Sequence, residues 1–382
     1  MSKLAIVVIA YNRLDSLKRL IGSLLNADYL GDIVDLFISL DNSGIDTLEN
    51  FAESIIWPYG EKKIISHEER LGLKRHVLKC GELTEIYENI CVLEDDLYVS
   101  PGFYAFSKAA IDHFSDLDEV AGISLYSHQW NPYVNRPFYA MQDGYDIYSM
   151  QIASSWGQIW NRNSWRDFVQ WMEGKTDQDL KSDNFPGAVS DWSEKSWLKF
   201  HNRYLVDQNK YFVYPRCSLT TNFSDPGEHA ELTSTYQVPL LVRAKQDYSF
   251  PVNIESSTRY DAFFENMDIA SSIGVPDQDL DVSFYYNRIA TKRFLLTSAI
   301  HDKKIVKTFG MRLRPIELNV IYEIPGDDIF LYDMSINSRN TRSRCRYYAR
   351  RFLYDIKSNS KRHLLISASA LYLSAIRKRL FK

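Results

Sequence analysis

The sequence predicts an α/β fold with a mostly parallel central sheet and flanking helices. Two observations indicate this fold. Short apolar runs alternate with amphipathic segments through the first hundred residues, and strands that are joined through helices pair in parallel with right-handed crossovers. Three of the apolar runs also end in polar side chains, which is typical of a sheet that binds its ligand at the carboxyl ends of its strands.

Four strands are expected in this region, at residues 4–10 (LAIVVIA), 35–41 (DLFISLD), 63–66 (KIIS) and 89–95 (NICVLED). Residues 12–26 carry Leu and Ile at spacings of three and four, which predicts an amphipathic helix with Asn12 as its N-cap. Because the carboxyl ends of parallel strands share one edge, the polar groups that end three strands should meet there. These groups are Tyr11-Asn12, Asp41-Asn42 and Glu94-Asp95-Asp96.

In the rest of the chain the pattern of residue types changes twice. Residues 121–239 are aromatic and irregular, whereas residues 240–338 alternate apolar and polar positions in short runs broken by Pro and Gly, which predicts a small α+β module. Residues 339–382 have a helical pattern and contain thirteen Lys and Arg against one acid. We therefore expect three domains: a catalytic domain at 1–239, an accessory module at 240–338 and a basic helical tail at 339–382.

Composition narrows the class of protein. An apolar share of 45% and a charged share of 25% are typical of a globular protein with a core. None of the four cysteines form a CxxC pair, which favours a reducing compartment and a cytoplasmic location. The net charge of -4 combines a tail of +12 with a body of -16, so we expect no nucleic acid as a partner. The first apolar run is too short for a signal peptide.

The acidic triad Glu94-Asp95-Asp96 presents a physical conflict, because crowded carboxylates repel one another and burial increases the repulsion. A divalent cation, Mn²⁺ or Mg²⁺, would remove the conflict, and Mg²⁺ typically combines one or two carboxylates with substrate phosphates. The chain has no P-loop, G-x-G-x-x-G, H-E-x-x-H or G-x-S-x-G motif. A metal-bridged diphosphate is thus the best way for it to hold a nucleotide; the alternative is a solvated acidic loop without function.

Six sequence blocks, in order over residues 4–230, resemble those of GT-A glycosyltransferases. They are VVIAYNRLDSLKRLIGSLL, ISLDNSG, RLGLKRHV, VLEDDLYVSPGFYAF, SSWGQIW and YPRCSLTTNFSDPGEHA. The chain is most similar to bacterial family 2 enzymes and to the animal N-acetylglucosaminyltransferase I type, which share an E-D-D followed by VSP-x-F. Residues 240–382 resemble no family that we can name.

The resemblance implies a role for each candidate residue of the donor site. Asp96 would ligate the metal, and His229 would complete the metal or diphosphate site, although alone it reads as an ordinary loop histidine. The remaining roles are donor-sugar and ribose contacts by Glu94 and Asp95, a base contact to uracil by Asp41, a base and ribose pocket lined by Ala10, Tyr11 and Asn12, and diphosphate contacts by Arg70 and Lys74. Arg70 and Lys74 fit a solvated helix face nearly as well.

The acceptor side is less well specified. Inverting transfer needs a base to deprotonate the acceptor hydroxyl, and the resemblance implies an acid between the W-G block and the late histidine. The candidates are Asp183, Asp191, Glu194 and Asp207, of which we choose Asp191 because it precedes Trp192. The chain departs from the family where relatives often place an acid after a Trp, since it has Leu198 and Lys199 there. Trp156 and Gly157 would shape the acceptor site; the alternative for Trp156 is a place in the core.

The expected function is therefore inverting, metal-dependent transfer of a sugar from a nucleotide-diphosphate sugar, UDP-linked, to a hydroxyl of a cell-surface glycan or lipid-linked precursor. One alternative is a sugar nucleotidyltransferase, but such enzymes usually carry a Gly-rich basic loop where this chain has AYNRLDS. A non-catalytic glycan-binding protein with a degenerate site is the other.

The tail adds a prediction of its own. Its uncharged stretch, residues 363–376, would span about 21 Å as a helix, which is less than the ~30 Å hydrocarbon core of a bilayer. We expect peripheral contact of 339–382 with the inner face of the cytoplasmic membrane; the alternative is a helix packed on the body.

Overall fold

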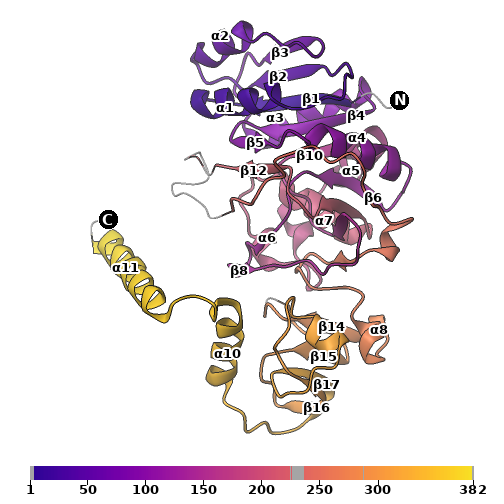
Figure 1. The fold of residues 1–382 in the computed structure, drawn as a ribbon, viewed down its shortest axis with the longest axis vertical. Helices are drawn as coiled ribbons and strands as arrows, with labels where there is room; N and C mark the ends of the chain where they lie inside the picture. The colour runs from indigo at the N-terminus through magenta and orange to yellow at the C-terminus, as the bar shows by residue number, and fades with distance from the viewer. Residues whose placement is uncertain (1–3, 224, 226–235, 287, 381–382) are drawn as a thin grey trace. The chain divides into compact units, whose positions relative to one another are not determined.

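The computed structural model describes residues 4–223, 225, 236–286 and 288–380 of the 382-residue chain (Figure 1). The chain forms two compact units, residues 1–268 with 287–289 and residues 269–286 with 290–382. The compact units thus divide after Asp268, and residues 240–268 lie with the first unit. The division into domains at 239/240 and 338/339 stays a prediction.

A nine-stranded mixed sheet forms the centre of the first unit, in the order β13-β9-β11-β6-β10-β4-β1-β2-β3. Five of its pairings are parallel; the antiparallel ones join β10 to β4, β10 to β6 and β11 to β9. The predicted mostly parallel sheet with flanking helices is confirmed. Its strands are β1 Leu4–Ala10, β2 Leu36–Leu40, β3 Lys62–Ser66, β4 Asn89–Glu94, β6 Val120–Ser124, β9 Ile147–Met150, β10 Gln158–Asn161, β11 Tyr211–Pro215 and β13 Arg259–Tyr260.

Helices and two short antiparallel pairs complete this unit. The helices are α1 Leu14–Leu25, α2 Thr47–Ser54, α3 Leu73–Gly81, α4 Phe103–Phe114, α5 Arg162–Met172, α6 Gly187–Ser190 and α7 Leu198–Asp207, with 3-10 turns at Glu82–Glu85, Asp177–Leu180 and Ile254–Ser256. The pairs are β5 Leu97–Val99 with β12 Thr220–Asn222, and β7 Trp130–Asn131 with β8 Arg136–Pro137. The β5–β12 pair brings Phe223 beside the acidic triad, where its backbone N–H donates to the carbonyl oxygen of Asp96 over 3.1 Å.

Helix α1 follows the predicted pattern along its length but not at its start. Its buried stripe, which includes Leu17, Leu20 and Leu24, packs in one core cluster with alternate residues of β1, and burial of each such side chain stabilises the fold by about 1.5–3 kcal/mol. The predicted N-cap at Asn12 is wrong. Arg13 occupies the N-cap without a capping side-chain bond, because the Asn12 side chain lies at a cavity instead.

The second unit contains a four-stranded sheet in the order β14-β15-β17-β16. Its elements are α8 Ala270–Ile273, a 3-10 turn at Asp277–Asp279, β14 Leu280–Ser283, β15 Phe294–Thr297, β16 Lys303–Phe309, α9 Leu318–Ile321, β17 Ile329–Asn337, α10 Arg344–Ile356 and α11 Lys361–Leu380. Strands are therefore present within residues 240–338, where the sequence predicts a small α+β module.

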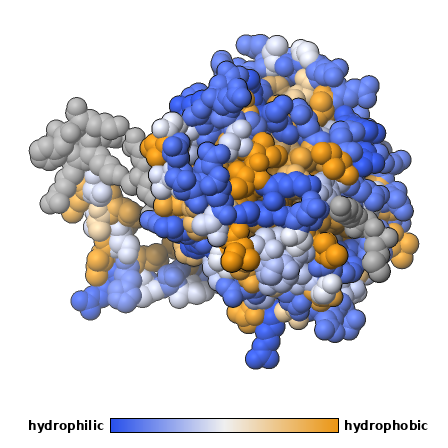
Figure 2. Space-filling model, turned by 90° about the horizontal axis from the view of Figure 1, so that it is seen from above, coloured by the Kyte–Doolittle hydropathy of each residue, from blue (hydrophilic) through white to orange (hydrophobic). Residues whose placement is uncertain are grey.

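The basic tail forms two helices with different surroundings. Helix α10 buries Tyr347, Arg351 and Tyr354 within the second unit. Helix α11 instead leaves Leu365, Leu371 and Tyr372 between 70% and 72% exposed. In the described part of the chain, no helix combines the length and the apolar character that crossing a membrane requires. On the face that Figure 2 shows, hydrophilic residues predominate and hydrophobic residues form small groups.

Candidate active site

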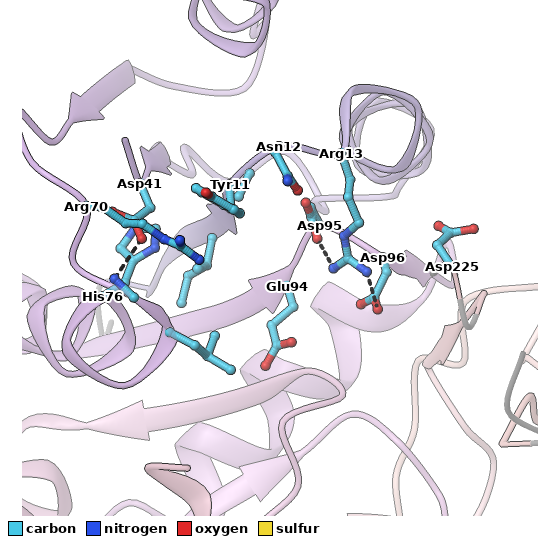
Figure 3. Close-up of a pocket in the computed structure, with 14 residues that line it drawn as sticks. Tyr11, Asn12, Arg13, Asp41, Arg70, His76, Glu94, Asp95, Asp96 and Asp225 are labelled. Atoms are coloured by element: carbon cyan, nitrogen blue, oxygen red, sulfur yellow. Dashed lines mark hydrogen bonds and ion pairs between the residues drawn. The ribbon is translucent and has the colours of Figure 1, made fainter. Parts of the chain in front are cut away.

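The carboxyl ends of β1, β2 and β4 meet at one cavity of about 200 Å³ (Figure 3). The three strands are adjacent and parallel, with Ile9 paired to Glu94 and Ala10 paired to Leu40, so their ends lie level. The cavity is lined by Ile9, Ala10, Tyr11, Asn12, Arg13, Asp41, Arg70, Gly72, Leu73, His76, Glu94, Asp95, Asp96 and Asp225. The structure thus assembles all the sequence-predicted donor residues except Lys74, together with Asp96.

Arg13 partly neutralises the acidic triad. Its guanidinium donates to Asp95 and, over 3.1 Å, to Oδ2 of Asp96, while Glu94 points away from this pair (Figure 3). Burial raises the pKa of Asp95 to about 6, although Arg13 opposes the shift. Burial, with the charges of Asp96 and Asp95, raises the pKa of Glu94 to about 8. The conflict among crowded carboxylates is therefore present in the fold and only partly compensated.

The donor set fits a hard divalent cation. Asp96 Oδ1 is buried and has no hydrogen-bond partner. Asp225 lines the same cavity, where Ser16 Oγ donates to it over 2.6 Å and Arg19 also pairs with it. Within the described ranges no three His, Cys, Asp or Glu side chains gather as a metal group, and His229 lies outside those ranges. A cation here would take a ligand from Asp96 and others from a diphosphate, a combination that Mg²⁺ commonly uses.

At the opposite end of the cavity, Asp41 fixes the loop that precedes α3. Its carboxylate accepts hydrogen bonds from the backbone N–H groups of Asn42, Leu71 and Gly72, over 2.9, 2.7 and 2.9 Å. The Arg70 guanidinium lies 4.8 Å from the centroid of the Tyr11 ring. A carboxylate has about four lone-pair sites, so Asp41 retains capacity for a further donor such as the N–H of a nucleotide base.

Two histidines and a lysine complete the surroundings of this loop. His76 Nε2 lies 2.7 Å from Ser39 Oγ, and burial lowers the pKa of His76 to about 4, so its ring is neutral near pH 7. His67 Nε2 contacts the same hydroxyl over 3.3 Å. Lys74 does not line the cavity; its Nζ lies 4.1 Å from the centroid of the Phe200 ring. The diphosphate contact of Lys74 stays a prediction.

A second cavity, of about 350 Å³, adjoins the first. It is lined by His128, Pro132, Tyr133, Ile152, Ala153, Ser154, Ser155, Trp156, Ala188, Trp192, Leu198 and Tyr236. Ser155 lies close enough to Glu94, which lines the first cavity, to oppose the rise in the pKa of Glu94, so the walls of the two cavities approach each other there. Trp156 is thus in a cavity wall. Gly157 is not, but its φ of +91° and the 2.8 Å that would separate a Cβ from Thr220 Cγ2 explain why glycine follows Trp156.

The base candidates stand apart from both cavities. Asp191 is exposed at the end of α6 and lines neither, although its neighbour Trp192 and Ala188 line the second. The other three candidates line neither cavity as well. Where the chain departs from the family pattern, Lys199 is fully buried, with its Nζ 2.6 Å from Asp177 Oδ2 and 2.9 Å from the Trp192 carbonyl oxygen. The choice of Asp191 stays a prediction.

Sequence reasoning missed Arg13, His76, Asp225 and His128. Arg13 offered one signal, since it directly follows a strand-end motif that lies at the predicted edge. Asp225 lies within a quoted block, only four residues before His229. His76 and His128 belong to segments without any metal or catalytic spacing, so only the fold could place them in cavity walls.

Comparison with known proteins agrees with this arrangement. Residues 5–170 match the model of Glycosyl transferase family 2. Over 258 residues the chain is 24% identical to an alpha-1,3-mannosyl-glycoprotein 2-beta-N-acetylglucosaminyltransferase of Arabidopsis thaliana, an alignment that covers 62% of this chain and 50% of the relative. The chain thus spans about half the length of that relative. The resemblance to family 2 and to N-acetylglucosaminyltransferase I-type enzymes is confirmed.

Solved structures show more distant likenesses. S. aureus TarS 1–349 in complex with UDP-GlcNAc is 15% identical with a TM-score of 0.38, over 59% of this chain and 60% of that chain. GalNAc-T7 with UDP, GalNAc and Mn²⁺ is 15% identical with a TM-score of 0.43, over 58% and 44%.

Proposed function

Because residues 5–170 match the model of Glycosyl transferase family 2, we propose that this chain is an inverting, metal-dependent glycosyltransferase. It transfers a sugar from a nucleotide-diphosphate sugar, UDP-linked, to a hydroxyl of a glycan or lipid-linked precursor. The observation that carries the proposal is the single cavity at the ends of β1, β2 and β4, where Asp41 lies at one end and the acidic triad at the other.

The donor would lie along this cavity. Asp41 and Tyr11 would hold the base, and Asp95 and Glu94 would contact the ribose and the donor sugar. Asp96, with its unpartnered Oδ1, would hold Mn²⁺ or Mg²⁺, and the bound cation would stabilise the charge that develops on the leaving diphosphate. The name of the Arabidopsis relative supports an N-acetylhexosaminyl donor over other hexosyl donors.

The acceptor would enter from the second cavity, whose wall contains Trp156. Ser155 in the wall of this cavity lies near Glu94 in the wall of the donor cavity, so an acceptor hydroxyl there would be close to the donor sugar. An inverting reaction needs a base on the side opposite the diphosphate. Asp191 is the proposed base, since it adjoins Trp192 in the wall of this cavity.

The test is a donor screen that reads nucleotide release with Mn²⁺, with Mg²⁺ and with EDTA. We expect metal-dependent release from a UDP-sugar that a hydroxyl acceptor increases. Equal turnover in EDTA contradicts the metal-dependent mechanism. Release of pyrophosphate from a nucleoside triphosphate and a sugar phosphate would instead identify a nucleotidyltransferase, and no turnover or nucleotide binding at all would identify a non-catalytic protein.

Peripheral contact with an anionic membrane belongs to the same proposal. Helix α11 exposes large apolar side chains, among them Leu365, Leu371 and Leu373, over a stretch that basic residues flank on both sides. An exposed apolar surface of this kind marks an interaction site, and each Lys or Arg near anionic lipid contributes ~1 kcal/mol. A lipid-linked acceptor would give such contact a purpose.

Co-sedimentation with phosphatidylserine-containing vesicles tests the membrane contact. The informative truncation ends at Ser360, because it removes α11 and leaves α10, which packs in the second unit. The full chain should sediment with anionic vesicles and the truncated chain should not, with uncharged phosphatidylcholine vesicles as the control. Equal behaviour of the two chains contradicts the contact.

A further inference from the structure

The second cavity differs from the first in having no charged wall. The described lining residues include no Asp, Glu, Lys or Arg, and burial lowers the pKa of His128 to about 3, so its ring is neutral near pH 7. Aromatic rings dominate instead: the ring centroids of Trp156 and Tyr236 are 5.3 Å apart, and those of Tyr133 and Trp192 are 6.2 Å apart. Flat aromatic walls with few polar groups suit a ligand that has apolar faces and a small number of hydrogen-bonding groups.

His128 supplies the unsatisfied polar group of this cavity. The residue is 94% buried, its exposed fraction being 6%, and its Nε2 is buried without a hydrogen-bond partner. Its ring lies among aromatic rings, with centroids 5.2 Å from Tyr126 and 6.1 Å from Trp156. An unpartnered buried nitrogen costs about 1–3 kcal/mol, and a ligand hydroxyl in the cavity would recover that free energy.

We propose that the second cavity binds an uncharged pyranose ring as the acceptor, with its apolar face against the aromatic wall and one hydroxyl hydrogen-bonded to His128. This proposal rests on the proposed glycosyltransferase function and names its acceptor class: a saccharide terminus without carboxylate, phosphate or sulfate. His128 is then a specificity-determining residue, because a site built to pair with a hydroxyl discriminates strongly against analogues that lack it.

Charge is the basis of the exclusion. An anionic sugar would lose its hydration on entering the cavity and would find no cationic side chain among the described lining residues. Burial of an unpaired charge is far more costly than burial of a hydroxyl that gains a partner.

The experiment combines a saccharide panel with two matched histidine variants of the full chain. The probes are the methyl glycosides of glucose, galactose and N-acetylglucosamine, with methyl glucuronide and N-acetylneuraminic acid as anionic counterparts. Binding is followed by tryptophan fluorescence and saturation-transfer NMR, and acceptor KM and kcat are measured separately from donor hydrolysis.

His201 provides the control for His128. It is 1% exposed, has an unpartnered buried Nδ1 and lies among aromatic rings, but it lines neither cavity. We expect His128→Phe to weaken neutral-saccharide binding and raise acceptor KM about ten- to a hundredfold. His128→Gln, which keeps a side-chain nitrogen, should recover most of the binding, and His201→Phe should bind as the wild type does.

The outcomes separate this proposal from the proposed function. Failure of all UDP-sugar hydrolysis counts against the glycosyltransferase itself. With hydrolysis present, the acceptor proposal is overturned if anionic sugars bind the wild type as well as neutral ones, or if no neutral probe binds. It is also overturned if His128→Phe binds like the wild type, or if His201→Phe loses binding equally. The wild-type panel decides the charge question even where a variant does not fold.

Discussion

The two cavities of the first unit share one wall and differ in nearly everything else. The first is built from the ends of three parallel strands and gathers five carboxylates and two guanidinium groups around one space. The second is built mainly from loops and short helices, and aromatic rings enclose it. Burial favours the uncharged form in both, since it raises the pKa of Glu94 in the first cavity and lowers the pKa of His128 in the second. Charge in the first cavity suits a diphosphate and a cation, whereas the neutral second cavity suits a sugar ring.

The largest effect should come from the charged cavity. Asp96→Ala removes the proposed metal ligand, and transfer should fall by about 10³-fold or more, since a catalytic metal supplies several kcal/mol to the transition state. Metal-dependent nucleotide binding should disappear with it, as measured by a thermal-shift titration with UDP and Mn²⁺. Asp15→Ala, at a fully exposed carboxylate of α1, is the control and should behave as the wild type. Wild-type activity of Asp96→Ala would show that the first cavity does not work through a metal.

The next largest effect should come from the catalytic base proposed beside the second cavity. Asp191→Asn should reduce kcat by about 10²–10⁴-fold, the range for loss of a general base, while donor binding stays intact. The comparison set is Asp183→Asn, Glu194→Gln and Asp207→Asn, measured under the same conditions. An inactive member of that set beside an active Asp191→Asn reassigns the base and leaves the reaction class unchanged.

The smallest expected effect is the loss of stability in acid that the two buried histidines, His128 and His201, should cause. Burial lowers the pKa of His128 and of His201 to about 3, against ~6.5 in an unfolded chain. Below pH 6.5 the folded state therefore binds fewer protons than the unfolded state. The stability that depends on the neutral histidine is fully present above pH 6.5 and is lost as the pH falls towards 3. Each buried histidine should lower the free energy of unfolding by about 2 kcal/mol when the pH falls from 7.5 to 5.

Tryptophan fluorescence during urea denaturation measures this quantity for the first unit alone, because all eight tryptophans precede residue 200. His128→Phe and His201→Phe should each reduce the loss of stability in acid by a similar amount. His363→Phe, at an exposed position of α11, should leave the loss unchanged. A variant that keeps the full acid sensitivity of the wild type would show that the replaced histidine is protonated in the folded state.

Local patterns were enough to locate the donor edge. The runs at 4–10, 35–41, 63–66 and 89–95 became β1 to β4 within a residue at each end, since apolar runs bounded by polar breaks have few other stable uses. Parallel pairing then required Asp41 and the acidic triad to share an edge, and they do. The leucine stripe of α1 was equally readable, although its first turn was not.

Other features depended on contacts that no local pattern encodes. Arg13 lies more than eighty residues from Asp95 and Asp96, and only the alignment of β1 with β4 brings their charges together. The second cavity draws its wall from residues between 128 and 236. The two helices of the basic tail also differ in burial, although both are rich in basic residues. Helix α10 packs through Tyr347, Arg351 and Tyr354, whereas α11 remains exposed.

The sequence by itself determined the first four strands, their parallel direction and the acidic edge, because apolar periodicity and the chain direction act over a few residues at a time. Only the tertiary structure decided which charges are paired, which histidines are buried and where a second cavity opens. Those outcomes depend on distances between residues far apart in the chain and on how deeply packing removes each group from water, which shifts the free energy of a charge by several kcal/mol.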